Sequence, residues 1–211
     1  MSPTLIFVHA EVVVVDPRND SAERAFALTT PEAAVVVAAA STGPVGGCGH
    51  GMDWFLRRLG VHLLARLTDR PDRGITACLA DTIAETAALH GARCDLAHEA
   101  TPAASVVACR VQARELQYLV LGPGVVELHH NGGPSSRMTG PDGPLAAVRA
   151  RPSIAAHAGT GTARLDTLTG ASLTADATGR PGARITLTFR TFRPVPGPAG
   201  PIPGRRRHER P

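Results

Sequence analysis

Residues 34–42 read AVVVAAAST and decide how the rest of the chain is interpreted. The run Val35-Val36-Val37 lacks the polar alternation of a half-buried strand, so it predicts a strand that is buried on both faces. Such a strand needs a layer on each side. Strand-like segments lie before it and return near residue 104, and two helical segments lie between. The order of strands, two helices and strands favours an α+β fold with helices packed on antiparallel sheet.

Two amphipathic helices are predicted between residues 53 and 90. Apolar residues recur every four positions, which places them on one helical face. Asp53 is expected to cap the first helix, and Gly91 to take the left-handed conformation after the second. The repeating residues are Phe55, Leu59, Leu63 and Leu67 in the first helix, and Ile75, Leu79, Ile83 and Ala87 in the second.

The later strands are predicted at residues 104–111, 116–121 and 125–130, as a meander that Asn131-Gly132-Gly133 closes with hairpin chemistry. Residues 153–182 show little hydrophobic pattern. The alternation of Ile185, Leu187 and Phe189 with threonine and arginine then predicts a half-buried strand. We expect one domain over residues 1–193 and a disordered Pro/Gly/Arg-rich tail over residues 194–211.

Charge and composition narrow the function classes. The net charge is +4, and the cluster Arg205-Arg206-Arg207 with Arg210 supplies much of it. The body is therefore nearly neutral, which argues against a nucleic-acid-binding surface. The apolar N-terminal run contains His9 and Glu11 and has no basic segment before it. It predicts neither a signal peptide nor a membrane span, so we expect a cytoplasmic protein without membrane contact.

The four cysteines form no CxxC pair, so their spacing does not predict a structural zinc site. Cys78 and Cys109 fall on apolar faces and are expected in the core. Cys94 lies near histidines in the sequence but lacks an orienting third group for a nucleophile. His50, before the first helix, has two interpretations: a contact to phosphate or metal, or a loop–helix packing contact, which we favour. Trp54 is expected to anchor the core.

Several stretches resemble the metal-dependent 2C-type protein phosphatases, in an actinobacterial form. They are GCGHGMDWFLRRLG, AALHGARCDLAHEATPAASVVACR, LQYLVLG and, more faintly, RMTGPDGPLAAVRAR, at residues 47–60, 87–110, 116–122 and 137–151. The resemblance is best over residues 35–151 and diverges afterwards. It implies an αββα sandwich, in which two antiparallel sheets are flanked by helices and the C-terminal third is potentially incomplete. It also implies phosphate-ester hydrolysis at a site with two Mn²⁺ or Mg²⁺ ions.

The resemblance also shows which metal ligands are altered. The family's bridging Asp-Gly corner falls on Ala38 and Ala39, and a methyl group cannot bind a cation. Its Asp-Ser hairpin falls on Pro123 and Gly124. Its early acidic corner falls on residues 19–21, where Asp20 keeps a carboxylate and is the best surviving metal ligand. No convincing equivalent of the late Asp-Gly corner is found: Asp142 comes too early, and Asp166 and Asp176 lie in poorly patterned sequence.

Hard divalent cations take oxygen ligands, and a two-metal site needs several carboxylates. We therefore expect weak or no binding of Mn²⁺ or Mg²⁺, no assignable catalytic residue, and a binding or regulatory role with a phosphoprotein or regulatory protein as partner. One alternative is an active phosphatase that uses Asp16, Asp20 and Asp142. Another is a non-enzymatic interaction module whose tail, residues 205–211, docks an acidic partner.

Overall fold

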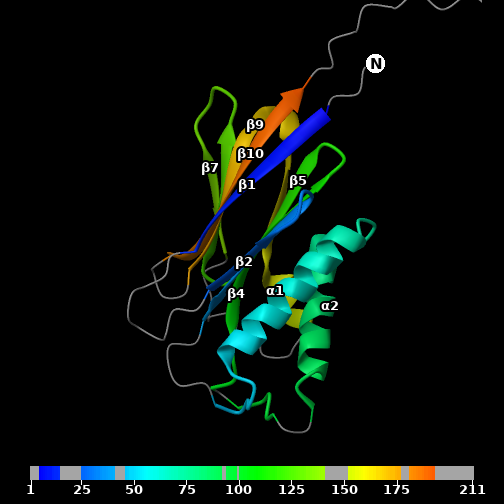
Figure 1. The fold of residues 1–211 in the computed structure, drawn as a ribbon, viewed down its shortest axis with the longest axis vertical. Coiled ribbons are helices and arrows are strands. Elements are labelled where there is room, and N and C mark those ends of the chain that lie inside the picture. Colours follow the sequence, from blue (N-terminus) through cyan, green and yellow to red (C-terminus); the bar gives the residue numbers. More distant parts are fainter. Residues whose placement is uncertain are drawn as a thin grey trace, which may run out of the picture.

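A computed structural model describes residues 5–14, 25–40, 46–91, 94–98, 100–140, 152–176 and 181–192. The fold is α+β, with two five-stranded antiparallel sheets and two helices, as the sequence predicted (Figure 1). The first sheet has the order β2-β3-β4-β5-β8, with bounds Ala25–Thr29, Ala33–Ala39, Ala104–Gln112, Glu115–Leu121 and Gly159–Arg164. The second has the order β1-β10-β9-β6-β7, with bounds Leu5–Val14, Pro181–Phe192, Leu168–Asp176, Gly124–His130 and Ser136–Thr139.

Strand β3 lies between two cores, as its unbroken apolar run predicted. Val35 and Val37 face the helices, whereas Val36 and Ala38 face the second sheet. Every residue of the strand is buried. The alternation of a strand's side chains therefore joins all three layers through β3.

Helices α1, Met52–Asp69, and α2, Ile75–Ala88, cover the outer face of the first sheet (Figure 1). The leucines predicted for α1 form the buried stripe. The residue at the N-cap position is Gly51, with φ of +79°, so Asp53 lies in the first turn and not at the cap. There its charge still favours the positive end of the helix dipole. Gly91 has φ of +59°, as expected for a chain leaving a helix.

The helical hairpin is fixed to the sheet by Arg110 of β4, which is 2% exposed. Its guanidinium donates to the carbonyl of Arg70 at 3.0 Å, the carbonyl of Arg73 at 2.9 Å and Oε1 of Gln117 at 2.6 Å. The first two carbonyls belong to the turn between α1 and α2. A buried cation is tolerated here because several oxygen dipoles surround it.

The second sheet alternates between apolar and polar faces. Ile185, Leu187 and Phe189 point into the core between the sheets, whereas Thr186 and Thr188 lie on the other face. Among the described residues, no helix lies on this outer face, so the helical layer expected there is not part of what the structure describes. A threonine-rich face suits contact with water.

Strands also form where the sequence showed little pattern. β8 and β9 occupy much of residues 153–182, joined by the 3-10 turn Leu165–Thr167, and the 3-10 turn Pro152–His157 precedes them. β10 pairs with both β9 and β1, so the last third of the chain belongs to the same sandwich. The tail at 194–211 lies outside the described residues. In the described part of the chain, no helix is both long and apolar enough to cross a membrane.

Candidate functional site

Strand ends from both sheets meet at one end of the sandwich. Ala38 in β3 pairs with Ala25 of β2 and with Ser105 of β4. In the second sheet, Val14 at the end of β1 pairs with Ala183 of β10. We call this region the Ala38 end. Because the resemblance aligns the bridging aspartate with Ala38, a two-metal centre of the 2C type would lie at this end.

The described side chains that form the core around Ala38 are apolar. The side chain of Ala38 is fully buried in the core between the sheets, as are those of Ala175 and Ala183. The hydroxyl of Ser105 on the neighbouring strand β4 donates to the carbonyl of Ala38 across 3.5 Å. Ala39 faces the opposite way, toward the helices. The altered corner is therefore part of the packed core.

The other altered corner, Pro123-Gly124, carries the chain from one sheet to the other. β5 belongs to the first sheet and β6 to the second, so the predicted meander is wrong at this connection. Gly122 has φ of +74°. A Cβ on Gly124 would lie 2.5 Å from Cγ2 of Val107 and 3.2 Å from the carbonyl of Thr174. The sequence pattern could not reveal the crossing because strands of either sheet show the same alternation.

The remaining predicted ligand, Asp20, lies outside the described residues, and so do Asp16 and Asp142. The residues that flank the first two are described: Val14 pairs with Ala183, and Ala25 pairs with Ala38, so both flanks lie at the Ala38 end. The prediction for Asp20 stays a prediction.

The two late aspartates lie at different ends. Asp166 forms a surface ion pair with Arg164, and Arg164 pairs with Glu115 at the end of the sandwich opposite to Ala38. The Arg164 guanidinium lowers the pKa of the Asp166 carboxyl. Asp176 ends β9 one residue beyond Ala175, so its backbone lies at the Ala38 end. The weak pattern of residues 153–182 concealed this placement.

The described residues do not fit the Mn²⁺ or Mg²⁺ centre that the resemblance implies. Such ions need a cluster of oxygen ligands. Across the described ranges, a single group of three or more His, Cys, Asp or Glu side chains comes close enough to hold an ion, and it contains no carboxylate. Its members are Cys48, His50 and Cys94.

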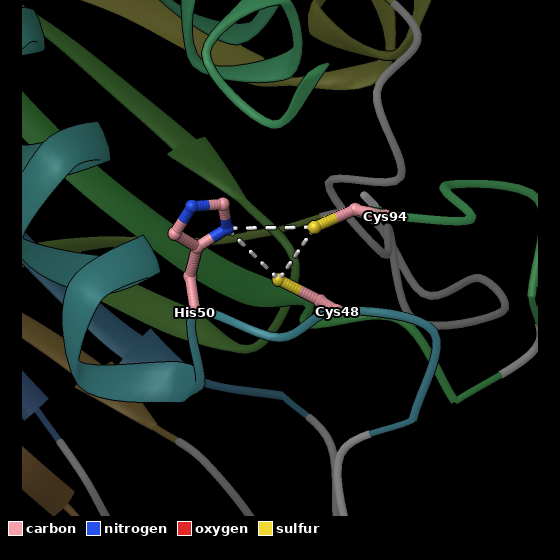
Figure 2. Close-up of side chains that lie close together, drawn as sticks. All are labelled: Cys48, His50 and Cys94. Atoms are coloured by element: carbon pink, nitrogen blue, oxygen red, sulfur yellow. Dashed lines mark hydrogen bonds between the residues drawn. The ribbon is translucent and has the colours of Figure 1, made fainter. Parts of the chain in front are cut away.

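This group, which we call the Cys-His cluster, joins two loops (Figure 2). Nδ1 of His50 lies 3.4 Å from Sγ of Cys94 and 3.8 Å from Sγ of Cys48, and the two sulfurs are 3.7 Å apart. Cys48 and Cys94 are half-buried, and His50 is exposed. All four cysteines are free thiols, and Cys78 and Cys109 are buried as predicted.

Opposing effects act on the thiol of Cys48. Burial raises its pKa above the usual value. The backbone amides of His50 and Gly51 donate hydrogen bonds to the same sulfur and lower the pKa, whereas the neighbouring thiol of Cys94 raises it. The net direction is upward, so the free thiol is favoured.

Sequence reasoning missed this cluster because it weighed cysteine pairs by their spacing. Cys48 and Cys94 are 46 positions apart. The available signal was the tripeptide Cys48-Gly49-His50, which brings a sulfur and an imidazole into one loop. The packing interpretation of His50 is also met, because its ring stacks on Trp54 with centroids 4.2 Å apart. Trp54 is partly buried against the helix-side core.

Solved structures with a similar fold include serine/threonine protein phosphatases. The catalytic domain of the serine/threonine phosphatase PstP, in complex with two manganese ions, is 8% identical. It aligns with 88% of this chain and 99% of its own, with a TM-score of 0.62. PppA, a regulatory component of the type VI secretion system in Pseudomonas aeruginosa, is 12% identical, with coverages of 90% and 100% and a TM-score of 0.56.

The PPM Ser/Thr phosphatase MsPP from Mycobacterium smegmatis, in complex with cacodylate, is 12% identical, with coverages of 85% and 97% and a TM-score of 0.55. No protein-family model and no curated protein matches the sequence. At these identities the likeness shows the fold alone, and the fold is that of the 2C-type phosphatases, as the sequence resemblance indicated.

Proposed function

We propose that this chain is a phosphatase-fold protein with weak or no phosphoester hydrolase activity, which acts by binding a phosphoprotein or a regulatory protein. The observation that carries the proposal is the burial of the Ala38 side chain. Its methyl group lies fully buried between the sheets, where the resemblance places the carboxylate shared by two metal ions.

Charge is the physical reason. Two divalent cations between the sheets would need several carboxylates to offset the cost of removing them from water. The described neighbours of Ala38 supply methyl groups, Ser105 and backbone that is already paired within the sheets. Even outer-shell changes at a metal site cost roughly 10- to 100-fold in affinity, so loss of the shared ligand costs more.

A second candidate is an active phosphatase that draws carboxylates from Asp16, Asp20 and Asp142. What favours it is placement: the flanking residues Val14 and Ala25 lie at the Ala38 end. The two candidates differ in one measurable property, which is metal-dependent turnover.

The test is hydrolysis of an aryl phosphate and of a phosphothreonine peptide by the full chain, with Mn²⁺, with Mg²⁺ and with chelator. We expect no turnover above that of buffer with the same metal. Metal-dependent turnover that disappears in Asp20→Asn, but persists in the distant control Asp166→Asn, would replace the proposal with the active candidate.

A further inference from the structure

We propose that Cys48, His50 and Cys94 bind one Zn²⁺ ion with tetrahedral geometry, and that a solvent molecule or an external ligand takes the fourth position. This site is separate from the phosphatase-type metal centre at Ala38. It uses side chains from the loop before α1 and the loop after α2, which meet in Figure 2.

The distances match those of tetrahedral zinc. With Zn–S of about 2.3 Å and Zn–N of about 2.0 Å, a tetrahedral ion places two sulfurs about 3.8 Å apart and a sulfur and a nitrogen about 3.5 Å apart. The cluster has 3.7 Å between the sulfurs and 3.8 and 3.4 Å from the sulfurs to Nδ1. An ion at the centre would need little movement of the three ligands.

The ligand chemistry selects the metal. Thiolate and imidazole suit Zn²⁺ and softer transition metals, whereas Mg²⁺ and Mn²⁺ prefer oxygen. Three protein ligands with one open position are also the arrangement found at catalytic rather than closed structural zinc sites. The Cys-His cluster is therefore expected to bind Mg²⁺ and Mn²⁺ weakly, although a 2C-type phosphatase site would bind these ions.

Backbone contacts hold the two loops together. The amide of Gly46 donates to the carbonyl of Ala100 at 2.8 Å, and the amide of Asp95 donates to the carbonyl of Gly47 at 2.7 Å. Gly47 has φ of +69°, and a Cβ there would lie 2.5 Å from Cβ of His98. This close approach requires glycine, and it brings the segments that carry Cys48 and Cys94 side by side.

The ligands are oriented before any ion binds. The ring of His50 is stacked on Trp54, with its Nδ1 directed at both sulfurs (Figure 2). Hydrogen bonds from the backbone amides of His50 and Gly51 act to lower the pKa of the Cys48 thiol. Amide hydrogen bonds of this kind stabilise a thiolate once a metal has displaced its proton.

The test is a Zn²⁺ titration of the reduced full chain, followed by calorimetry and by fluorescence. Trp54 is the only tryptophan in the sequence, and its contact with His50 makes its emission report on the site directly. We expect one equivalent to bind with a change in emission. Co²⁺ in place of Zn²⁺ should give the absorption of a tetrahedral thiolate complex.

Two kinds of variant separate the site from other thiols and histidines. His50→Gln and Cys94→Ser should each weaken Zn²⁺ binding by more than about 100-fold. His50 is exposed, so its replacement leaves the core intact. Cys109→Ala and His130→Gln should bind as the parent does, because Cys109 is buried with its pKa raised to about 12 and His130 is engaged with Ser136.

Two results would overturn the inference. One is Zn²⁺ binding by His50→Gln and Cys94→Ser that equals binding by the parent chain. The other is absence of saturable Zn²⁺ binding under reducing conditions. If a disulfide between Cys48 and Cys94 then forms in air, with the sulfurs at about 2.05 Å, the two cysteines are a redox pair and not metal ligands.

Discussion

Residue 38 has a methyl group at the position where the resemblance places a carboxylate. The physical consequence is a buried, apolar position that excludes water. Ala38 shares its face of β3 with Val36 and Ala34, and all three are fully buried between the sheets. Among the described residues, an ion placed there would meet hydrocarbon and paired backbone. The buried methyl group therefore supports the proposal of weak or absent Mn²⁺ and Mg²⁺ binding.

Returning the carboxylate is expected to harm the fold without restoring the chemistry. Ala38→Asp should lower the free energy of unfolding by about 3–5 kcal/mol, the cost of an uncompensated buried charge. Ala34→Asp, at an equally buried position on the same face, should cost a similar amount. Urea denaturation with and without Mn²⁺ measures both. Selective recovery of Ala38→Asp by Mn²⁺ would show that further oxygen ligands still converge there.

Sequence predicted the residues of the core better than those of the cluster. The burial of Val35 to Val37 could be predicted from these three residues alone, because a strand that is buried on both faces has an unbroken apolar sequence. Cys48 and Cys94 meet through the packing of two loops, which no short-range pattern records. Only the family resemblance marks position 38 as altered, since alanine is an ordinary residue in a buried apolar strand.

Among the elements, the helical hairpin depends on buried polar contacts as well as on its leucines. Arg110 donates to two carbonyls of the α1–α2 turn and to Gln117. Arg110→Met should leave these oxygens unpaired in the interior and lower the free energy of unfolding by roughly 2–4 kcal/mol. Thermal unfolding measures the loss. Arg114→Met, at an exposed position, is the control, and an equal effect of the two changes would remove the special role of Arg110.

A partly exposed ion-pair group also joins the two helices, and it makes their stability depend on pH. His62 and Arg66 of α1 lie 3.1 and 2.6 Å from Oε2 of Glu85 in α2. These contacts, that of His62 first, lower the pKa of Glu85 below its usual value. The stability they contribute is therefore present above the unfolded-state pKa of about 4.3, and it is lost as the pH falls through the lower folded-state value.

Glu85→Gln should cost about 0.5 kcal/mol near pH 7, because the group is partly exposed and screened by solvent. Near pH 3 the difference from the parent should shrink. Denaturant unfolding at both pH values measures it. A cost that is the same at the two pH values would assign the effect to packing and not to charge.

Element types could be predicted from sequence, whereas their partners could not. The leucine spacing of α1, the alternation of β10 and the hairpin at Asn131-Gly132-Gly133 are local signals, and the structure contains all three. The crossing at Gly122 to Gly124 depends on which sheet receives β6, a choice made by packing against Val107 and β9. Which sheet β6 joins does not change the hydrophobic periodicity of its sequence.

For the whole molecule, the pairing of β1 with β10 is the decisive contact (Figure 1). It joins residues 5–14 to residues 181–192, so the part of the chain where sequence resemblance fades still completes the second sheet. The likeness to PstP accordingly extends over 88% of the chain. Two paired five-stranded sheets with a buried methyl group at position 38 support the proposal of a scaffold kept for binding and largely without hydrolase activity.

The most direct measurement is a calorimetric titration of the reduced full chain with Mn²⁺, to which the Cys-His cluster should not contribute because it offers no oxygen ligand. A phosphoester assay runs in the same buffer. We expect a cooperatively folded protein with no saturable Mn²⁺ binding and no turnover. Tight binding of two Mn²⁺ ions with turnover would contradict this expectation and would show that carboxylates from other segments rebuild the phosphatase site.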